Sequence, residues 1–89
     1  MVQIELIPTL DHCIESTAKK EYHRLTLEYL GGKGPADFED KVDLLRTFLE
    51  TSDFRQLRKE SEAELLKEKT VKFILRMDKG EFTYQMVVD

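Results

Sequence analysis

Two histidines and one cysteine are the residues of this 89-residue chain best suited to bind a metal or act as a nucleophile. His12 and His23 would lie about 16 Å apart along a single helix, so they cannot share a metal ion. Cys13 follows His12 at about 100° round such a helix, which is poor geometry for a thiol–imidazole pair. Asp11 and Glu15 flank His12 at helical spacing. A solvent-facing helix accounts for these residues best, and we predict no metal site and no cofactor.

Carboxylates are numerous, with 18 Asp and Glu residues, but none stands beside an isolated apolar run with a partner acid. Acid–base catalysis needs a pocket that shifts a pKa. A chain of this length forms one domain, residues 1–89, and buries only about 60–65% of the surface that its unfolded form exposes. We therefore predict no catalytic centre and no enzyme.

The glycine-rich stretch Gly31–Pro35 contains Lys33 and invites comparison with a phosphate-binding loop. Such a loop needs a strand before it, and a Ser or Thr and a helix directly after the lysine. Here a helical pattern comes first, and Gly34 and Pro35 follow the lysine. The stretch is predicted to be a helix–helix connector, with Gly31 as the left-handed cap.

A basic cluster formed by Arg55, Arg58 and Lys59 occupies the first two turns of a predicted helix, where positive charge opposes the helix dipole. The order of elements here is similar to the latter part of a winged helix-turn-helix domain. One helix is followed by a short turn, the helix with the basic cluster and then a hairpin. That analogy implies nucleic-acid contacts at Arg55, Gln56, Lys59, Arg76 and Lys79.

Three features oppose nucleic-acid binding by this chain. The net charge is −4, Glu60, Glu62 and Glu64 follow the basic cluster at once, and a strand rather than a helix starts the chain. Glu50, just across the turn, can neutralise Arg55. Nucleic-acid binding is therefore the alternative hypothesis, and a solvated or interhelical charge cluster is the simpler explanation.

The elements that position these residues follow from hydrophobic periodicity. Alternation predicts a strand over residues 2–7, ended by Pro8. A helix over 10–30 follows, with Thr9 or Asp11 as its cap. Its predicted core face comprises Leu10, Ile14, Ala18, Tyr22, Leu25 and Tyr29. The opposite stripe comprises His12, Ser16, Lys19 and His23.

Two further helices are predicted over residues 38–51 and 54–68, with Asp37 capping the first and Ser52 or Asp53 the second. The first has an apolar face of Phe38, Val42, Leu45, Phe48 and Leu49. The second has a narrow apolar seam of Phe54, Leu57, Ser61 and Leu65. Arg58 and Glu62 are at ion-pair spacing.

The chain ends in a predicted hairpin whose alternation sets its register. Met77 should pair with Phe82, Leu75 with Tyr84 and Phe73 with Met86, all on one face. This requires a loop of two residues, Lys79–Gly80, or of four, Asp78–Glu81. Lysine is unfavourable as the first residue of a type I′ turn, which favours the four-residue loop.

The predicted fold is α+β with the order β-α-α-α-β-β, in which three helices cover one face of a small three-stranded sheet. Whether the first strand pairs with the hairpin is left open. Leu27 and Leu30 lie off the core face of their helix, and Ile74 and Val87 lie on the second face of the hairpin. These four residues are the predicted protein interface.

The sequence predicts a small non-catalytic interaction or regulatory module and indicates no more specific function. This module would bind itself as a homodimer or bind another protein. The start MVQIELIPTL has no basic residue, so it is not a signal peptide, and no apolar run approaches the roughly 18 residues of a membrane span. One cysteine suits a reducing cytosol. A cytoplasmic protein without membrane contact is expected.

Overall fold

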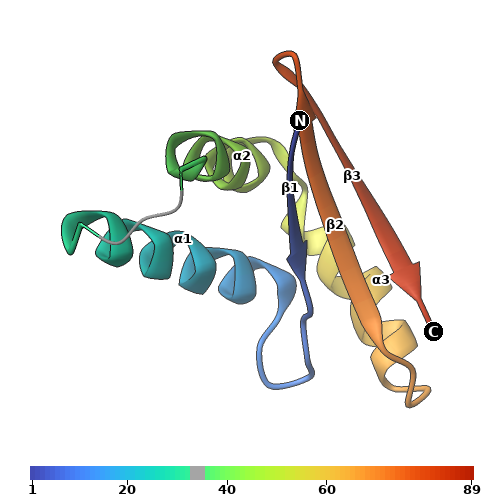
Figure 1. Ribbon diagram of the computed structural model, residues 1–89. Helices are drawn as coiled ribbons and strands as arrows, with labels where there is room; N and C mark the ends of the chain where they lie inside the picture. Colours follow the sequence, from blue (N-terminus) through green and yellow to red (C-terminus); the bar gives the residue numbers. More distant parts are fainter. Residues whose placement is uncertain (33–35) are drawn as a thin grey trace.

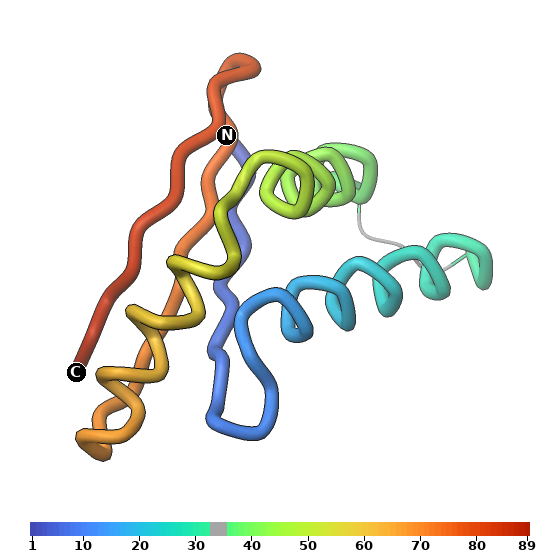
Figure 2. The backbone as a smooth tube through the Cα atoms, turned by 180° about the vertical axis from the view of Figure 1, so that it is seen from behind, coloured from blue at the N-terminus to red at the C-terminus, as the bar shows by residue number. Residues whose placement is uncertain are grey.

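The computed structural model (Figure 1) describes residues 1–32 and 36–89, with the element order β1-α1-α2-α3-β2-β3. The predicted α+β class and order are confirmed. One antiparallel sheet has the strand order β1-β2-β3, formed by Val2–Leu6, Val71–Asp78 and Glu81–Val88. The first strand therefore pairs with the hairpin, with Ile4 opposite Leu75. The helices lie on one face of the sheet (Figure 2).

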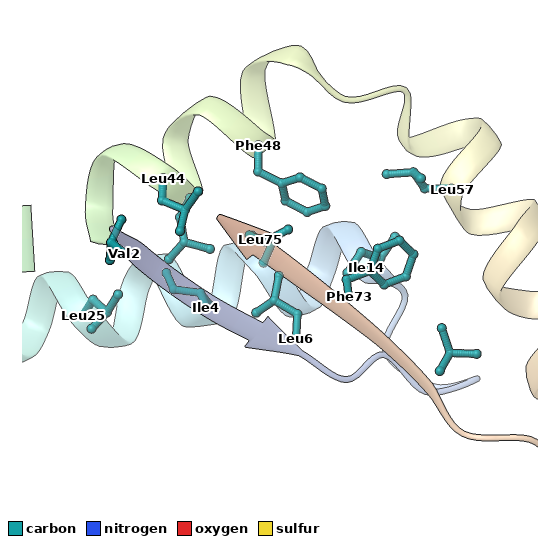
Figure 3. Close-up of a cluster of buried hydrophobic side chains, with 13 residues drawn as sticks. Val2, Ile4, Leu6, Ile14, Leu25, Leu44, Phe48, Leu57, Phe73 and Leu75 are labelled. Carbon is teal, nitrogen blue, oxygen red and sulfur yellow. The ribbon is translucent and has the colours of Figure 1, made fainter. Parts of the chain in front are cut away.

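The core lies between that face and the helices. Alternate residues of β1 and β2 point toward the helices, because side chains of a strand alternate between faces. Figure 3 shows these side chains meeting those of the helices. The buried residues on the sheet side are Val2, Ile4, Leu6, Val71, Phe73 and Leu75.

The first helix, α1, spans Ile14–Leu30, so the prediction of a start at Leu10 was wrong. The Thr9 hydroxyl accepts from the His12 N–H at 3.1 Å, and the Thr9 N–H donates to the His12 carbonyl at 2.9 Å. These bonds close a turn before the helix, so Thr9 caps that turn instead. Leu10 consequently lies outside the helix and is 56% exposed, contrary to its core assignment.

The C-terminal end of α1 also departs from the predicted core face. Tyr29 is 54% exposed, and its ring stacks on Phe38 at 4.3 Å between centroids. The left-handed residue after the helix is Gly32, with φ of 74°, whereas Gly31 has φ of −81°. The left-handed cap therefore lies one residue later than predicted. The rest of the proposed connector, including Lys33, lies outside the described residues.

The second helix, α2, spans Phe38–Thr51 with the predicted bounds. Asp37 precedes it but forms no capping hydrogen bond through its side chain, contrary to expectation. Leu44 is fully buried beside Leu45 and Phe48, although it was not in the predicted apolar face. The helix packs against α1 as well as against β1 and β2, so a wider arc of its surface is covered.

The third helix, α3, spans Phe54–Leu65. Of the two predicted caps, Asp53 is the one used: its carboxylate accepts from the Gln56 N–H at 3.3 Å. The helix ends three residues earlier than predicted. Glu68 adopts a left-handed φ of 63°, and the Lys69 N–H returns to the Glu64 carbonyl at 3.3 Å. These bonds satisfy carbonyls at the helix end.

The hairpin has the predicted register, with Met77 opposite Phe82 and Leu75 opposite Tyr84. The preference for a four-residue loop was wrong, because Asp78 pairs with Glu81 and leaves a two-residue loop. Both loop residues have positive φ, 53° at Lys79 and 80° at Gly80, as in a type I′ turn. The twist of that turn matches the twist of the strands, and this outweighs the strain at the lysine.

Candidate functional site

The outer strand, β3, carries apolar side chains that the helices leave partly uncovered. Each lies on the helix side of the sheet, opposite a residue of β2. Tyr84 is 46% exposed, although its partner Leu75 is fully buried. The other three are partly buried. We call this set the β3 apolar row; it comprises Phe82, Tyr84, Met86 and Val88.

The position of the helices explains the exposure of the row. α2 packs on β1 and β2, α3 packs on β2, and α1 reaches β1. In Figure 2, α3 passes in front of β2 while β3 runs along the outer margin of the sheet. The helix layer is thus centred on the first two strands and thins toward β3.

One end of the row is attached to the core through aromatic contacts. The ring of Phe48, fully buried in α2, lies 6.2 Å from Phe82 and 5.9 Å from Tyr84 between centroids. Phe54 meets the same ring edge-to-face at 5.2 Å. These contacts orient the Tyr84 side chain while almost half of it stays exposed. This end of the row is therefore held against the core.

The backbone of the same four residues faces outward. Thr70 and Asp89, which continue the ladder, exchange both backbone hydrogen bonds, at 3.3 and 3.0 Å. Hydrogen-bonded and non-hydrogen-bonded pairs alternate along an antiparallel ladder. It follows that Glu81, Thr83, Gln85 and Val87 bond to β2. The N–H and C=O groups of the β3 apolar row point away from the sheet, at its edge.

This edge lacks the features that usually block pairing with another chain. Edge strands are commonly short or carry lysine or proline. β3 has eight residues, contains neither, and has its single charge at Glu81. The opposite edge strand, β1, has five residues and is followed by Pro8. The two edges of the sheet therefore differ in how readily they could accept another strand.

The four residues predicted as an interface lie in two separate places. Leu27 and Leu30 are exposed near the C-terminal end of α1, at 55% and 75%. Ile74 and Val87 lie on the sheet face opposite the helices, and both are half-buried. We call this face the open face; it comprises Gln3, Glu5, Lys72, Ile74, Arg76, Thr83, Gln85 and Val87.

Polar contacts dominate the open face. Lys72 pairs with Glu5 at 3.9 Å, and Arg76 donates to the Gln3 side-chain oxygen at 3.1 Å. Sequence reasoning placed Phe82, Tyr84 and Met86 on one face of the hairpin but did not identify them as a site. The available signal was the combination of an eight-residue apolar strand with no lysine or proline.

The predicted nucleic-acid contacts are spread over several surfaces. Arg55 and Lys59 line a hollow of about 380 Å³ together with Cys13 and Glu15. Gln56 donates from its side chain to Glu60 at 3.0 Å. The predicted neutralising contact is not seen: no ion pair joins Glu50 to Arg55 within residues 1–32 and 36–89.

The hairpin residues of the same hypothesis lie elsewhere. Lys79 lines a hollow of about 330 Å³ with Asp37 and Asp40, which are acidic. Arg76 is on the open face, hydrogen-bonded to Gln3. The five residues therefore do not form one continuous basic surface.

Arg58, the remaining member of the basic cluster, forms the predicted ion pair with Glu62 at 2.9 Å. The hydrogen bond to Glu62, supported by the charge of that carboxylate and by Cys13, raises the pKa of the Arg58 guanidinium. Arg24 is similar: its hydrogen bond to Glu21 raises its pKa. Both arginines are exposed, so their ion pairs belong to a solvated charged surface.

The two histidines do not share a helix, contrary to the prediction, because α1 begins at Ile14. His12 is exposed in the turn before α1, where Lys20 Nζ lies 3.3 Å from its Nδ1, and His23 is exposed further along the helix. Cys13 is a half-buried free thiol. Within the part of the chain that the structure describes, no three His, Cys, Asp or Glu side chains gather closely enough to hold a metal ion.

Comparison with known proteins places the chain in a family. A protein-family model matches residues 2–87, almost the whole sequence, and the chain belongs to that family, whose function is uncharacterised. No curated protein and no solved structure matches the chain. Among the helices in the described residues, none is both long and apolar enough to cross a membrane.

Proposed function

We propose that this protein is a non-catalytic interaction module that self-associates. The observation that carries the proposal is the β3 edge, where four partly exposed apolar side chains and four sets of outward backbone groups coincide. A sheet edge of this kind is a template for another strand. Pairing there would bury the apolar row and satisfy the backbone at the same time.

The size of the chain supports self-association, and the distribution of its charge favours a contact along β3. An 89-residue domain has a modest core, so it gains stability by burying more apolar surface. Two copies that each carry a net charge of −4 repel one another. The repulsion is weakest along β3, because residues 82–88 are uncharged. A homodimer in the cytoplasm, where the free Cys13 stays reduced, is the form we propose.

The first experiment is sedimentation of the wild-type protein over a wide concentration range. We expect a reversible monomer–dimer equilibrium. Tyr84→Lys, which places a charge in the apolar row, should shift the protein to monomer without unfolding it. Circular dichroism checks that the fold is retained.

Ile74→Lys is the matched control. Ile74 is also a half-buried sheet residue, but it lies on the open face opposite Glu5, which can accept the new charge. This variant should still dimerise. Loss of the dimer in Ile74→Lys alone would place the contact on the open face. A wild-type protein that stays monomeric throughout would disprove self-association.

A further inference from the structure

We propose that two copies pair antiparallel through β3 about a twofold axis at Tyr84, forming a continuous six-stranded sheet. This inference rests on the self-association proposed above and specifies its geometry. Antiparallel pairing of identical strands is isologous, since each copy offers the same surface to the other. The outward backbone groups of the β3 apolar row would form the new ladder.

The backbone permits a small set of registers. Outward-facing residues must meet outward-facing residues, so each member of the row can oppose only another member. Most of the row stays paired in three registers. They are centred on Tyr84, Gln85 or Met86, and the central residue lies opposite the same residue of the second copy. A shift by one residue would set the outward groups against groups already bonded to β2.

Charges at the ends of β3 separate these registers. Centring on Gln85 gives the longest overlap, but it sets Glu81 against Asp89 of the second copy at both ends. Like charges directly opposite are destabilising. Centring on Tyr84 moves Lys79 toward Asp89 of the second copy and turns two repulsions into two attractions. Centring on Met86 loses as much overlap without this gain.

The side chains also suit the Tyr84 register. On the helix side, the exposed part of the Tyr84 ring meets its own counterpart, and aromatic cross-strand pairs are favourable. Phe82 meets Met86 of the second copy, a contact between a ring and a thioether sulfur. On the open face, Thr83 lies opposite Gln85 of the second copy. None of these pairs buries a charge.

The axis is perpendicular to the sheet, because opposed residues of antiparallel strands share a face. Both helix layers therefore lie on the same side of the six-stranded sheet, and the two open faces become continuous. The ends of α1, with Leu27 and Leu30, stay free for a different contact.

Disulfide trapping tests the register directly. In a Cys13→Ser background, Thr83→Cys and Gln85→Cys are prepared separately, one with a size tag, then mixed and oxidised. Non-hydrogen-bonded antiparallel pairs have Cα atoms about 4.5 Å apart, within the range of a disulfide. We expect a cross-linked heterodimer from the mixture and little cross-linking from either variant alone.

Each other result has a defined meaning. Cross-linking of Gln85→Cys with itself would overturn the Tyr84 register in favour of the longest overlap. No cross-link in a protein that sediments as a dimer would overturn the Tyr84 register and leave self-association intact. A protein that sediments as a monomer would overturn the self-association on which the inference rests.

The charges offer a second test whose sign depends on the register. Asp89→Asn should raise the dimer Kd about two- to tenfold at low salt, because two attractive cross-strand pairs are lost. In the Gln85 register the same change would relieve repulsion and lower the Kd. Glu81→Gln is the control: it faces Val87 in the proposed register and should leave the Kd nearly unchanged, whereas a lower Kd would contradict the proposal.

Discussion

The two strands of the hairpin have similar apolar patterns, but their side chains are buried to different extents. β2 and β3 each have eight residues, both alternate apolar with polar side chains, and they pair along their whole length. Phe73 and Leu75 of β2 are nevertheless completely buried, while Met86 and Tyr84 opposite them keep exposed surface. Alternation assigns a side chain to a face, but the helices decide how far it is covered.

The same comparison separates two roles for apolar residues. In β2 they are held between the sheet and α2 and α3, so they stabilise the monomer. In β3 they lie where the helix layer thins, so the apolar surface that they leave exposed can be buried when another chain covers it. A surface of this kind can serve stability and association together.

The largest difference should come from alanine substitution at two residues that face each other across the two strands. Phe73→Ala should lower the free energy of unfolding by about 3–5 kcal/mol, because it empties a fully packed site. Met86→Ala, directly opposite, should lower it by about 1 kcal/mol. Urea unfolding at protein concentrations below dimerisation measures both. Equal losses would mean that β3 is covered as completely as β2.

A smaller loss should follow from weakening the helix that covers β2. Leu57→Ala in α3 removes a side chain that is 3% exposed, and should lower the free energy of unfolding by about 2–3 kcal/mol. Leu66→Ala, at a site that is 71% exposed just beyond the helix, is the matched control and should change it by less than about 0.5 kcal/mol. Thermal unfolding followed by circular dichroism distinguishes them. A comparable loss at Leu66 would place the end of α3 in the core.

The smallest effect concerns the loop that joins the two strands. Lys79 has φ of 53°, a conformation that asparagine tolerates better than lysine. At protein concentrations below dimerisation, Lys79→Asn should therefore stabilise the protein by about 0.5 kcal/mol, raising Tm by roughly 2–4 °C. The control substitution Asp78→Asn, which is of similar size and lies outside the loop, should leave Tm unchanged. An unchanged Tm in Lys79→Asn would argue against the type I′ turn.

The pattern of apolar residues within single elements predicted much of the fold. The bounds of α2 follow from its apolar spacing, and the hairpin register follows from alternation, because a one-residue slip would reverse the faces. The start of α1 was missed because the Thr9 hydroxyl accepts from the His12 N–H in a turn. From the sequence, such a turn cannot be distinguished from a helix capped by Thr9. Leu44 was missed because α1 covers a second side of α2.

The candidate site was predicted less well than the fold. Leu27 and Leu30 were correctly expected off the core face of α1, and Ile74 and Val87 on the second sheet face. The distance of β3 from the helices could not be inferred, since it depends on where α2 and α3 cross the sheet. For this reason the partial exposure of Tyr84 was not predicted.

The sequence by itself determined the type and order of the elements, the face to which each strand residue points and the pairing within the hairpin. Those properties depend on residues close together in the chain and on the geometry of a single helix or strand. Only the tertiary structure decided that β1 joins β2 and that β3 remains a free edge with its apolar row half covered. These depend on how elements far apart in sequence pack, and burial is a property of that packing.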